Sequence, residues 1–355
     1  MTDGRDNADW PGTVCPTPLS DHKRILLGHG SGGKLTADLV RDLFLPAFHN
    51  QYLARLDDQA VLPLNGARVA FTTDAFVVTP LFFPGGDIGT LAVNGTVNDL
   101  AMSGARPLYI AAAFILEEGL EIDELARVVD SMRRTASAAG VQLVTGDTKV
   151  VDRGKGDKIF ITTTGLGVVE GSVVIAADRA RPGDKIIVSG TIGDHGTAIL
   201  SQRENLEFDG AIESDTAALH TLVAAMLEAS DQIHCLRDPT RGGVATTLNE
   251  LAAASGVGLE IDEKTIPVKE SVKGACEILG LDPLYIANEG KLVALVAAEA
   301  AEKVIGKMRA HPLGAEARII GEAVAPHAGM VLLRTAIGGK RVLDVLRGEQ
   351  LPRIC

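Results

Sequence analysis

The sequence predicts an α/β protein of the α+β type, with two sandwich domains built on mixed sheets. A chain of 355 residues is too long for one small hydrophobic core, so two domains are expected. Hydrophobic residues make up 46% and aromatic residues only 4%, with 39 glycines, as is typical of α/β proteins rich in small aliphatic side chains. Predicted strands and helices follow one another without strict βαβ alternation, which argues against a doubly wound Rossmann sheet.

The first half of the chain shows strand and helix patterns after an irregular start. Residues 1–24 are polar, contain three prolines and show no period, so we expect a flexible leader. Segment 67–78 is rich in β-branched and aromatic residues and predicts a strand. Segment 87–104 predicts a helix, with Asp87 as N-cap and Gly104 near its end. The other predicted elements are a buried strand at 107–116, an amphipathic helix at 121–140 and strands at 141–147 and 158–169.

A turn with the sequence RPGD lies within 177–190, before a new apolar strand, and marks the predicted domain boundary. Further predicted elements are helices from Asp194, at 242–255 and at 299–310, and strands at 257–262, 291–297, 317–324 and 329–335. We therefore expect a leader at 1–24, an N-terminal domain at 25–175, a C-terminal domain at 176–337 and a mobile tail at 338–355.

Charge and cysteine usage restrict the class of protein. Lys and Arg number 34 against 46 Asp and Glu, a net charge of −12 that argues against nucleic-acid and anionic-membrane partners. The amino terminus lacks the apolar core of a signal peptide, and no apolar stretch is long enough for a membrane span. The cysteines, which are Cys15, Cys235, Cys276 and Cys355, form no CxxC pair. This usage predicts free thiols in a reducing compartment and a cytoplasmic protein.

Two glycine-rich segments are candidates for phosphate binding. GHGSGGK places Gly30, Gly32 and Gly33 before Lys34, where free backbone amides and a cation could approach an anion. Its spacing is not that of a Walker A loop, and a flexible hinge is the alternative. RDPTRGG opens a predicted helix beside Arg241 and could bind phosphate at the helix amino terminus, or be an ordinary loosened helix start.

Aspartates at the ends of predicted elements suggest a divalent-cation site. They are Asp74 in TTDAF, Asp99 in VNDLA, Asp147 in TGDTK and Asp238 in RDPTRGG. Carboxylates grouped in a dry site repel one another, and Mg²⁺ with nucleotide phosphates would relieve that repulsion. Each could instead be a helix cap or a turn residue. Asn94 and Asn98 lie four apart on one helix face beside Asp99. Buried amides need partners, so the sequence favours a ligand-facing or intersubunit role for them over a solvated face.

Three further residues could handle protons: Lys149, His195 and Glu289. A lone histidine or lysine is more often structural or solvated, so the sequence leaves their roles open. The chain ends in GEQLPRIC, which places the thiol of Cys355 at its free end. Pro352 stiffens this segment, and Arg353 could lower the pKa of the thiol or hold the tail in an acidic site.

Taken together, several motifs resemble the HypE family of hydrogenase maturation proteins. They are GHGSGG, TDAFVVTPLFFPGGDIGTLAVNGTVNDLAMSGA, TGDTKVV, RDPTRGG, NEGK and the terminal PRIC, which is the most specific. The resemblance runs from about Ile25 to Cys355. It places the chain in the superfamily of aminoimidazole ribonucleotide synthetase and selenophosphate synthetase. The leader, with Cys15, precedes the usual start of that family.

The resemblance implies a PurM-like, ATP-dependent enzyme, usually a homodimer whose N-terminal domains pair into a β-barrel. In that family the carbamoyltransferase HypF loads a carbamoyl group onto the terminal cysteine, and ATP drives its dehydration to a thiocyanate. The cyano group then passes to iron held by a HypC–HypD complex, for [NiFe]-hydrogenase.

Carried over to this chain, the resemblance makes Cys355 the carrier thiol and assigns the other candidates by motif. Lys149, His195 and Glu289 would face the thiocarboxamide. Magnesium would be held by Asp74, Asp99, Asp147 and Asp238. ATP would be bound by these aspartates together with Gly30, Gly32, Gly33, Lys34, Asn94, Asn98, Thr145, Gly146 and Arg241.

Two rival functions remain at this point. One is another activity of the superfamily, such as selenophosphate synthesis or small-metabolite phosphorylation. Selenophosphate enzymes carry a reactive cysteine or selenocysteine near the glycine-rich segment, whereas Leu27 precedes that segment here. The other is a non-catalytic thiol carrier or scaffold, which would need no magnesium site.

Overall fold

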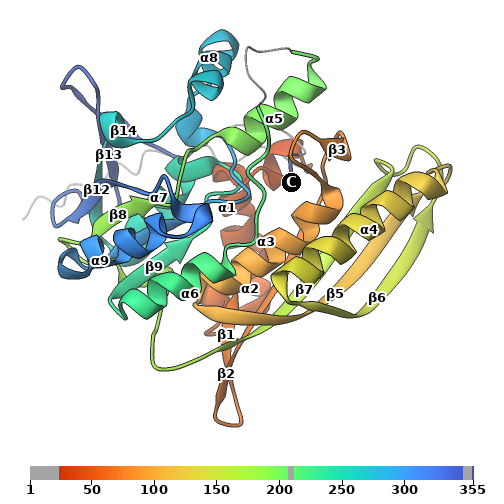
Figure 1. Cartoon of the computed structure of the whole chain (residues 1–355), viewed down its shortest axis with the longest axis horizontal. Coiled ribbons are helices and arrows are strands. Elements are labelled where there is room, and N and C mark those ends of the chain that lie inside the picture. The colour runs from red at the N-terminus through yellow and green to blue at the C-terminus, as the bar shows by residue number, and fades with distance from the viewer. Residues whose placement is uncertain (1–23, 207–211, 347–353) are drawn as a thin grey trace, which may run out of the picture.

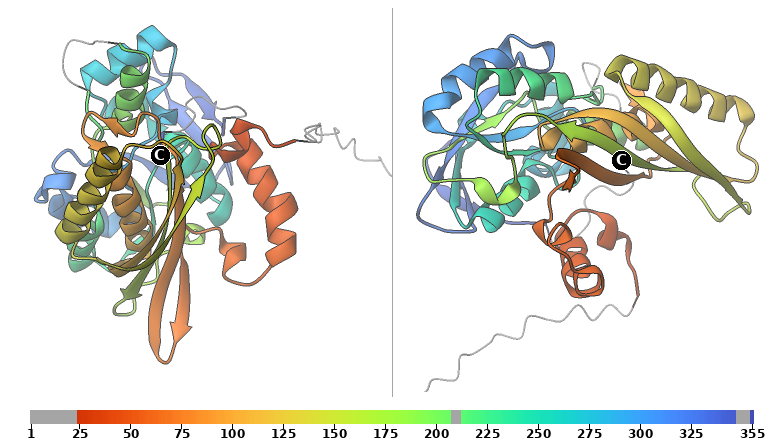
Figure 2. Two further views of the ribbon diagram at one scale, coloured as in Figure 1. Left: turned by 90° about the vertical axis from the view of Figure 1, so that its right-hand side faces the viewer. Right: turned by 90° about the horizontal axis from the view of Figure 1, so that it is seen from below.

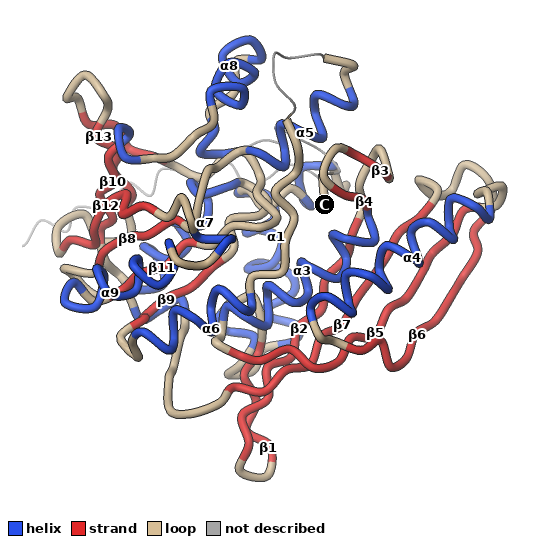
Figure 3. Tube along the Cα trace, viewed as in Figure 1, coloured by secondary structure: helices blue, strands red, loops and turns tan. Residues whose placement is uncertain are grey.

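Two mixed β-sheets with helices packed on them make up the computed structural model, which describes residues 24–206, 212–346 and 354–355 (Figures 1 and 3). The predictions for the leader, Cys15, Pro352 and Arg353 lie outside the described residues. Among the described residues, no helix is both long and apolar enough to cross a membrane.

The N-terminal sheet has the strand order β1-β2-β7-β5-β6. Its strands are β1 (Ala60–Leu64), β2 (Ala67–Phe76), β5 (Ala105–Glu117), β6 (Gln142–Val151) and β7 (Ile159–Val169). β5 and β6 run parallel, and the other neighbours are antiparallel. The sheet is therefore mixed, as the sequence predicted. A short hairpin, β3 (Phe82–Phe83) and β4 (Gly86–Asp87), connects β2 to the first long helix.

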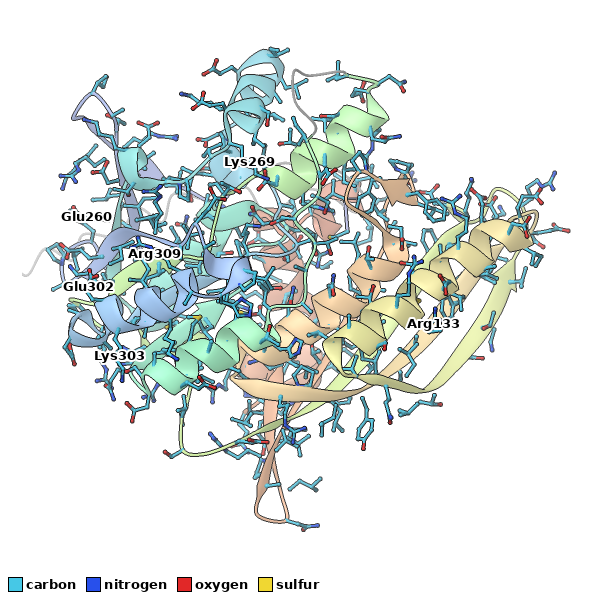
Figure 4. All side chains as sticks on the ribbon, in the orientation of Figure 1. Arg133, Glu260, Lys269, Glu302, Lys303 and Arg309 are labelled. Atoms are coloured by element: carbon cyan, nitrogen blue, oxygen red, sulfur yellow. The ribbon has the colours of Figure 1, made fainter. Side chains whose placement is uncertain are left out.

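Helices α3 (Ile88–Met102) and α4 (Ile122–Ala139) pack against each other on one face of this sheet (Figure 1). Asp87 caps α3 as predicted, because its carboxylate accepts from the N–H groups of Gly89 and Thr90. α3 is buried on nearly all sides, its polar Asn94 and Asn98 included, whereas α4 is amphipathic. Figure 4 labels Arg133 on α4, one of its exposed charged side chains.

The opposite face of the N-terminal sheet carries exposed apolar side chains. Phe71 on β2 is 44% exposed, and Tyr109 and Ile115 on β5 are 44% and 41% exposed. β6 is an edge strand whose residues are exposed from Gln142 to Val150. An apolar sheet face and an unpaired edge of this kind are typical of surfaces that are covered in an assembly.

The second sheet has seven strands in the order β14-β13-β10-β12-β8-β11-β9. They are β8 (Lys185–Val188), β9 (Ile233–Arg237), β10 (Gly258–Asp262), β11 (Val293–Val296), β12 (Arg318–Val324), β13 (Val331–Arg334) and β14 (Lys340–Leu343). α7 (Gly243–Ser255) packs on one face, whereas α6 (His220–Ala229) and α9 (Ala298–Arg309) pack on the other. Figure 4 labels three exposed charged residues of α9, which are Glu302, Lys303 and Arg309.

The remaining α-helices of the described residues are α1 (Lys34–Leu39), α2 (Leu45–Phe48), α5 (Asp194–Arg203) and α8 (Glu270–Leu279). Figure 2 shows α1 and α2 standing apart from the N-terminal sheet. Strand β14 differs from the sequence prediction. Residues 340–343 pair with β13, whereas the sequence predicts that they belong to the tail. Three of its four residues are exposed, so it lacks the apolar pattern that would have revealed a strand.

The last two residues of the chain return to the N-terminal sheet. Ile354 forms an isolated antiparallel bridge with Val78, just beyond the end of β2. Figure 1 places the C-terminus near β3 and the start of α3, far along the chain from either element.

Candidate active site

Four aspartates from separate elements lie close enough to perturb one another. Asp74 is on β2, Asp99 is on α3, Asp238 directly follows β9, and Asp58 precedes β1. Burial raises the pKa of all four carboxyl groups. Repulsion adds to this effect, since the other three aspartates raise the pKa of Asp99 further. The site therefore holds an excess of negative charge. The structure brings three of the predicted aspartates together and adds Asp58.

This carboxylate cluster, defined as Asp58, Asp74, Asp99 and Asp238, fits Mg²⁺ together with phosphate. Within the described ranges no three His, Cys, Asp or Glu residues are already close enough to hold a metal ion. Mg²⁺ in nucleotide sites is held by one or two carboxylates and completes its coordination with phosphate oxygens and water. A cation would also offset the repulsion that raises the carboxyl pKa values. Thr72 Oγ donates to Asp99 Oδ2 at 2.7 Å and orients that carboxylate.

Arg237 supports the cluster from the second sheet. Its guanidinium pairs with the carboxylate of Asp58 and donates to the Leu56 carbonyl at 2.8 Å. It also lies 3.4 Å from Glu250. Attraction to Arg237 opposes the rise in the pKa of Asp58 that burial causes. This contact joins the segment before β1 to β9, so both sheets contribute to the site.

The glycine-rich segment packs against Arg241 at the edge of the same site. Arg241 Nη1 donates to the Gly30 carbonyl at 3.0 Å. Gly32 has φ +76°, and a Cβ on it would lie 2.8 Å from the Arg241 Cβ, so the approach requires glycine. A Cβ on Gly33 would lie 2.7 Å from the Leu346 carbonyl oxygen, which accepts from the Lys34 N–H at 3.0 Å. The structure thus brings both glycine-rich motifs together, as expected for a phosphate-binding region.

Cys355 lies inside this site. The Val77 N–H donates to a terminal carboxylate oxygen of Cys355 at 2.7 Å, which extends the Ile354–Val78 bridge. Burial raises the pKa of the Cys355 thiol to about 12; Arg241 opposes the rise, and Glu289, Asp74 and Asp238 add to it. The docked sulfur is therefore a neutral thiol near neutral pH. Its charge neighbours are the groups that the sequence singled out.

The His195 ring contacts the chain end at the backbone of Ile354. Its Nε2 lies 2.6 Å from the Ile354 carbonyl oxygen, and its Nδ1 lies 2.7 Å from Ser214 Oγ. The ring is fully buried at the start of α5, and burial lowers its pKa. His195 was expected to face the group carried on the thiol, but both of its nitrogens are engaged by other partners here.

Glu289 presents a buried carboxyl group without a hydrogen-bond partner on one oxygen. It is 3% exposed, and its Oε1 has no hydrogen-bond partner among the residues that the structure describes. Burial, then Asp238, Asp74 and Asp215, raise its pKa well above the usual value, and Arg241 opposes the rise. The Glu289 N–H donates to Asp215 Oδ1 at 3.0 Å, and Asp215 pairs with Lys291 at 3.0 Å. The backbone is thus fixed while the carboxyl group remains available.

Asn94 and Asn98 hold a neighbouring loop through their side-chain amides. Asn98 Oδ1 accepts from the Leu219 N–H at 2.8 Å, and its Nδ2 donates to the Ala217 carbonyl at 3.0 Å. Asn94 Nδ2 donates to Thr216 Oγ1 at 3.2 Å. The partners of these buried amides belong to the same chain, whereas the sequence favours a ligand-facing or intersubunit role. They are Thr216, Ala217 and Leu219, together with the Glu289 carbonyl, which accepts from Asn98 Nδ2 at 3.3 Å.

Thr145, Gly146, Asp147 and Lys149 lie on β6, away from the carboxylate cluster. Asp147 pairs with Ala113 of β5, which pairs with Thr162 of β7 and then with Ala75 of β2. Asp147 therefore points to the same face as Ala75, opposite to Asp74, across three strand spacings of about 4.8 Å. Lys149 Nζ pairs with the Asp147 carboxylate at 2.7 Å, and both side chains are exposed. Within one chain the structure does not bring this motif to the other candidates.

Several residues of the site had no signal in the sequence analysis. Asp58 belongs to an aspartate pair before β1, and that doublet could have suggested a role. Ser214 and Asp215 lie in an irregular segment between α5 and α6, where no periodicity or motif marks them. Their roles depend on contacts with residues far away in the sequence.

The chain matches two family models. AIR synthase related protein, N-terminal domain, covers residues 56–169, and the C-terminal domain of the same family covers residues 181–333. A relative from Cupriavidus necator named "Carbamoyl dehydratase HypE" is 59% identical over 333 residues, which are 94% of this chain and 95% of the relative.

Solved structures agree with these matches. A chain of a HypE–HypF complex has TM-score 0.83 and 48% identity, covering 87% of this chain and 99% of that one. A HypE structure in complex with ATP has TM-score 0.79 and 52% identity, covering 94% and 100%. The chain belongs to the HypE family of carbamoyl dehydratases, within the AIR synthase related proteins.

Proposed function

We propose that this chain dehydrates an S-carbamoyl group on its own Cys355 to a thiocyanate, using ATP. The supporting observation is the position of the chain end: Cys355 lies beside Arg241, Glu289 and the carboxylate cluster, held by Val77 and His195. A carrier that only displays a thiol has no need to bury it among groups suited to phosphate and cation binding. The product would supply the cyanide ligand of the iron in [NiFe]-hydrogenase.

The residue types suit the two steps of this reaction. The carbamoyl oxygen is a poor leaving group, so it attacks the γ-phosphorus of ATP and ADP leaves. Loss of one N–H proton gives an S-bound iminophosphate. Loss of the second proton forms the C≡N bond and expels phosphate, so the balance is carbamoyl plus ATP to thiocyanate, ADP and phosphate. Mg²⁺ on the carboxylate cluster would offset the negative charge of the phosphates, and the Arg241 guanidinium would offset it as well.

Glu289 is the proposed base for the first N–H proton, and the second passes to an oxygen of the departing phosphate. Its carboxyl group has a free oxygen and is buried beside Cys355. The raised pKa of Glu289 is closer to neutral pH, where a general base works most efficiently. Cation binding at the neighbouring aspartates would lower this pKa again and increase the carboxylate fraction.

The β6 motif supports a homodimer. Asp147 and Lys149 lie on the exposed face of the N-terminal sheet, beside Tyr109 and Ile115. We propose that two N-terminal domains, residues 25–175, pair through this face into a β-barrel and that residues 176–337 form the second domain. In that dimer the β6 motif of one copy would complete the ATP and thiocarboxamide site of the other.

The proposed partners follow from the chemistry of loading and unloading. A HypE relative has been crystallised with HypF, which we propose as the carbamoyl donor enzyme for this chain. An iron-carrying HypC–HypD complex is the proposed acceptor of the cyano group. Because these steps need ATP and a reduced thiol, we place them in the cytoplasm.

Mass measurement of the C-terminal peptide tests the proposal. The protein is incubated with carbamoyl phosphate, ATP, Mg²⁺ and HypF, and the peptide should gain a carbamoyl group and then lose one water. Cys355→Ser should gain neither, and omission of Mg²⁺ should stop the reaction after carbamoylation. A peptide that stays carbamoylated with Mg²⁺ and ATP present contradicts the dehydratase function. Selenophosphate formation or phosphorylation of a small metabolite would support the rival enzymes.

A further inference from the structure

We propose that Ser214 and His195 form a latch for the chain end, in which Ser214 fixes the imidazole so that its Nε2–H donates to the Ile354 carbonyl. The latch positions Cys355 in the site; His195 is then a positioning residue and does not remove the amide protons. The inference rests on the proposed function for its kinetic consequence only, because docking of the tail can be measured without dehydration.

The hydrogen bonds define which ring nitrogen of His195 carries the proton. The Ile354 carbonyl can only accept, so the 2.6 Å contact requires the proton on His195 Nε2. In a neutral ring Nδ1 is then an acceptor, and the Ser214 hydroxyl at 2.7 Å is its donor. The Ser214 oxygen in turn accepts from the Thr216 N–H at 3.2 Å. Burial lowers the pKa of His195 and favours this neutral form.

Packing holds both members of the latch in place. The Ser214 N–H donates to the Pro84 carbonyl at 2.8 Å, and Gly85 approaches so closely that a Cβ there would lie 2.6 Å from the Ser214 carbonyl oxygen. The Phe83 ring meets the His195 ring edge to face, with centroids 5.6 Å apart and an angle of 83°. The β3–β4 hairpin therefore fixes the ring plane and its hydroxyl partner together, and this leaves one orientation for Nε2.

The latch also separates two roles that the sequence left open. While the tail is docked, both nitrogens of His195 are committed, so the ring has no free position for an amide proton. Glu289 has the unpartnered oxygen instead. Position and proton transfer are thus assigned to different residues, on α5 and in the segment before β11.

Two measurements on the full chain test the latch. The first follows alkylation of Cys355 by iodoacetamide, read from the mass of the C-terminal peptide, in Ser214→Ala and in the control Ser201→Ala. Ser201 lies on α5 with His195, and its hydroxyl donates to the Thr197 carbonyl of the same helix at 2.7 Å. Loss of one net hydrogen bond, about 1 kcal/mol, should raise Cys355 alkylation about five-fold in Ser214→Ala. The control should stay within the error of wild type.

The kinetic consequence separates positioning from folding. In single turnovers of carbamoylated protein, Ser214→Ala should slow dehydration at saturating ATP by less than five-fold, because most of the chain ends stay docked, and it should leave the KM for ATP unchanged. A general loss of structure would change both, and it would also expose Cys235 and Cys276, which are buried. An unchanged alkylation rate in a folded Ser214→Ala protein overturns the latch.

The second measurement uses wild-type protein and does not depend on any variant. Nitrogen NMR of ¹⁵N-histidine protein, with His195 assigned by His195→Gln, should show a neutral ring protonated on Nε2 at pH 7. A ring protonated on Nδ1, or on both nitrogens, overturns the latch. If the tail docks as described but wild-type Cys355 is never dehydrated, the proposed function fails and the latch stands.

Discussion

Replacing Ile354 with alanine should release the chain end by a calculable amount. The Ile354 side chain is 5% exposed and belongs to the same buried apolar cluster as Val78, Phe83 and Ile199. The substitution removes three carbons at about 0.8 kcal/mol each, so docking should weaken by about 2.4 kcal/mol, or about 60-fold. Ile354→Val removes one carbon and should weaken docking only about four-fold.

The backbone contacts make this series interpretable. The Ile354 carbonyl accepts from His195 and the Cys355 carboxylate accepts from Val77, and neither substitution removes those acceptors. The measured change therefore reports the apolar contribution of one side chain. An unrelated loss of structure would instead expose Cys235 or Cys276, which serve as internal controls in the same digest.

The assay is the rate of Cys355 alkylation by iodoacetamide at low reagent concentration, where the rate follows the undocked fraction. Rates should rise in the order wild type, Ile354→Val, Ile354→Ala. Single-turnover dehydration at saturating ATP should fall in the same order. Equal alkylation rates for wild type and Ile354→Ala would refute the reasoning, because burial of the Ile354 side chain would then contribute nothing to docking.

Three further predictions concern charge in the site. Glu289→Gln should slow single-turnover dehydration by about 10²- to 10⁴-fold while Cys355 alkylation stays at the wild-type rate, which distinguishes a lost base from a lost tail. Docking should weaken about ten-fold per pH unit above about pH 8.5, because the docked thiol has a pKa of about 12 and the free thiol about 8.5. Because docking raises the pKa of the thiol, docking is fully stable below the pKa of the free thiol and weakens above it. The alkylation rate, corrected for the thiolate fraction, should reveal this weakening. Asp99→Asn should raise the melting temperature without ligand, since Asp74, Asp238 and Asp58 repel that carboxylate. Mg²⁺ with ATP should then stabilise the variant less than wild type, and equal stabilisation would contradict a cation ligand.

The sequence was sufficient for most of the architecture because the governing signals are local. The Asp87 cap, the apolar helix after it and the Gly140 end of α4 are where patterns of a few residues place them. Shorter elements were missed for a physical reason. β14 has one buried residue and is formed by pairing with β13, so its information lies in another strand.

The site was only partly predictable for the same reason. Asp74, Asp99 and Asp238 could be selected by their Gly, Thr and Asn neighbours, but their proximity depends on how β2, α3 and β9 pack. Asp147 carries an equally strong motif and lies on the opposite face, because one position along a strand decides which side a residue faces. Sequence alone shows the residue type, and the strand register decides whether it can meet its partners.

Docking through the backbone explains why a terminal cysteine can act as a carrier. The hydrogen bonds described at the chain end are accepted by the Ile354 carbonyl and the Cys355 carboxylate. Ile354 provides the buried apolar side chain, and Cys355 packs partly buried against the same cluster. The sulfur can therefore change from thiol to thiocarboxamide to thiocyanate while the same contacts hold the tail. A site that gripped the sulfur or its substituent would bind one of these states better than the others and would resist either loading or release. Recognition of the residue before the thiol avoids that conflict, and it leaves Arg241 and Glu289 free to act on the carried group.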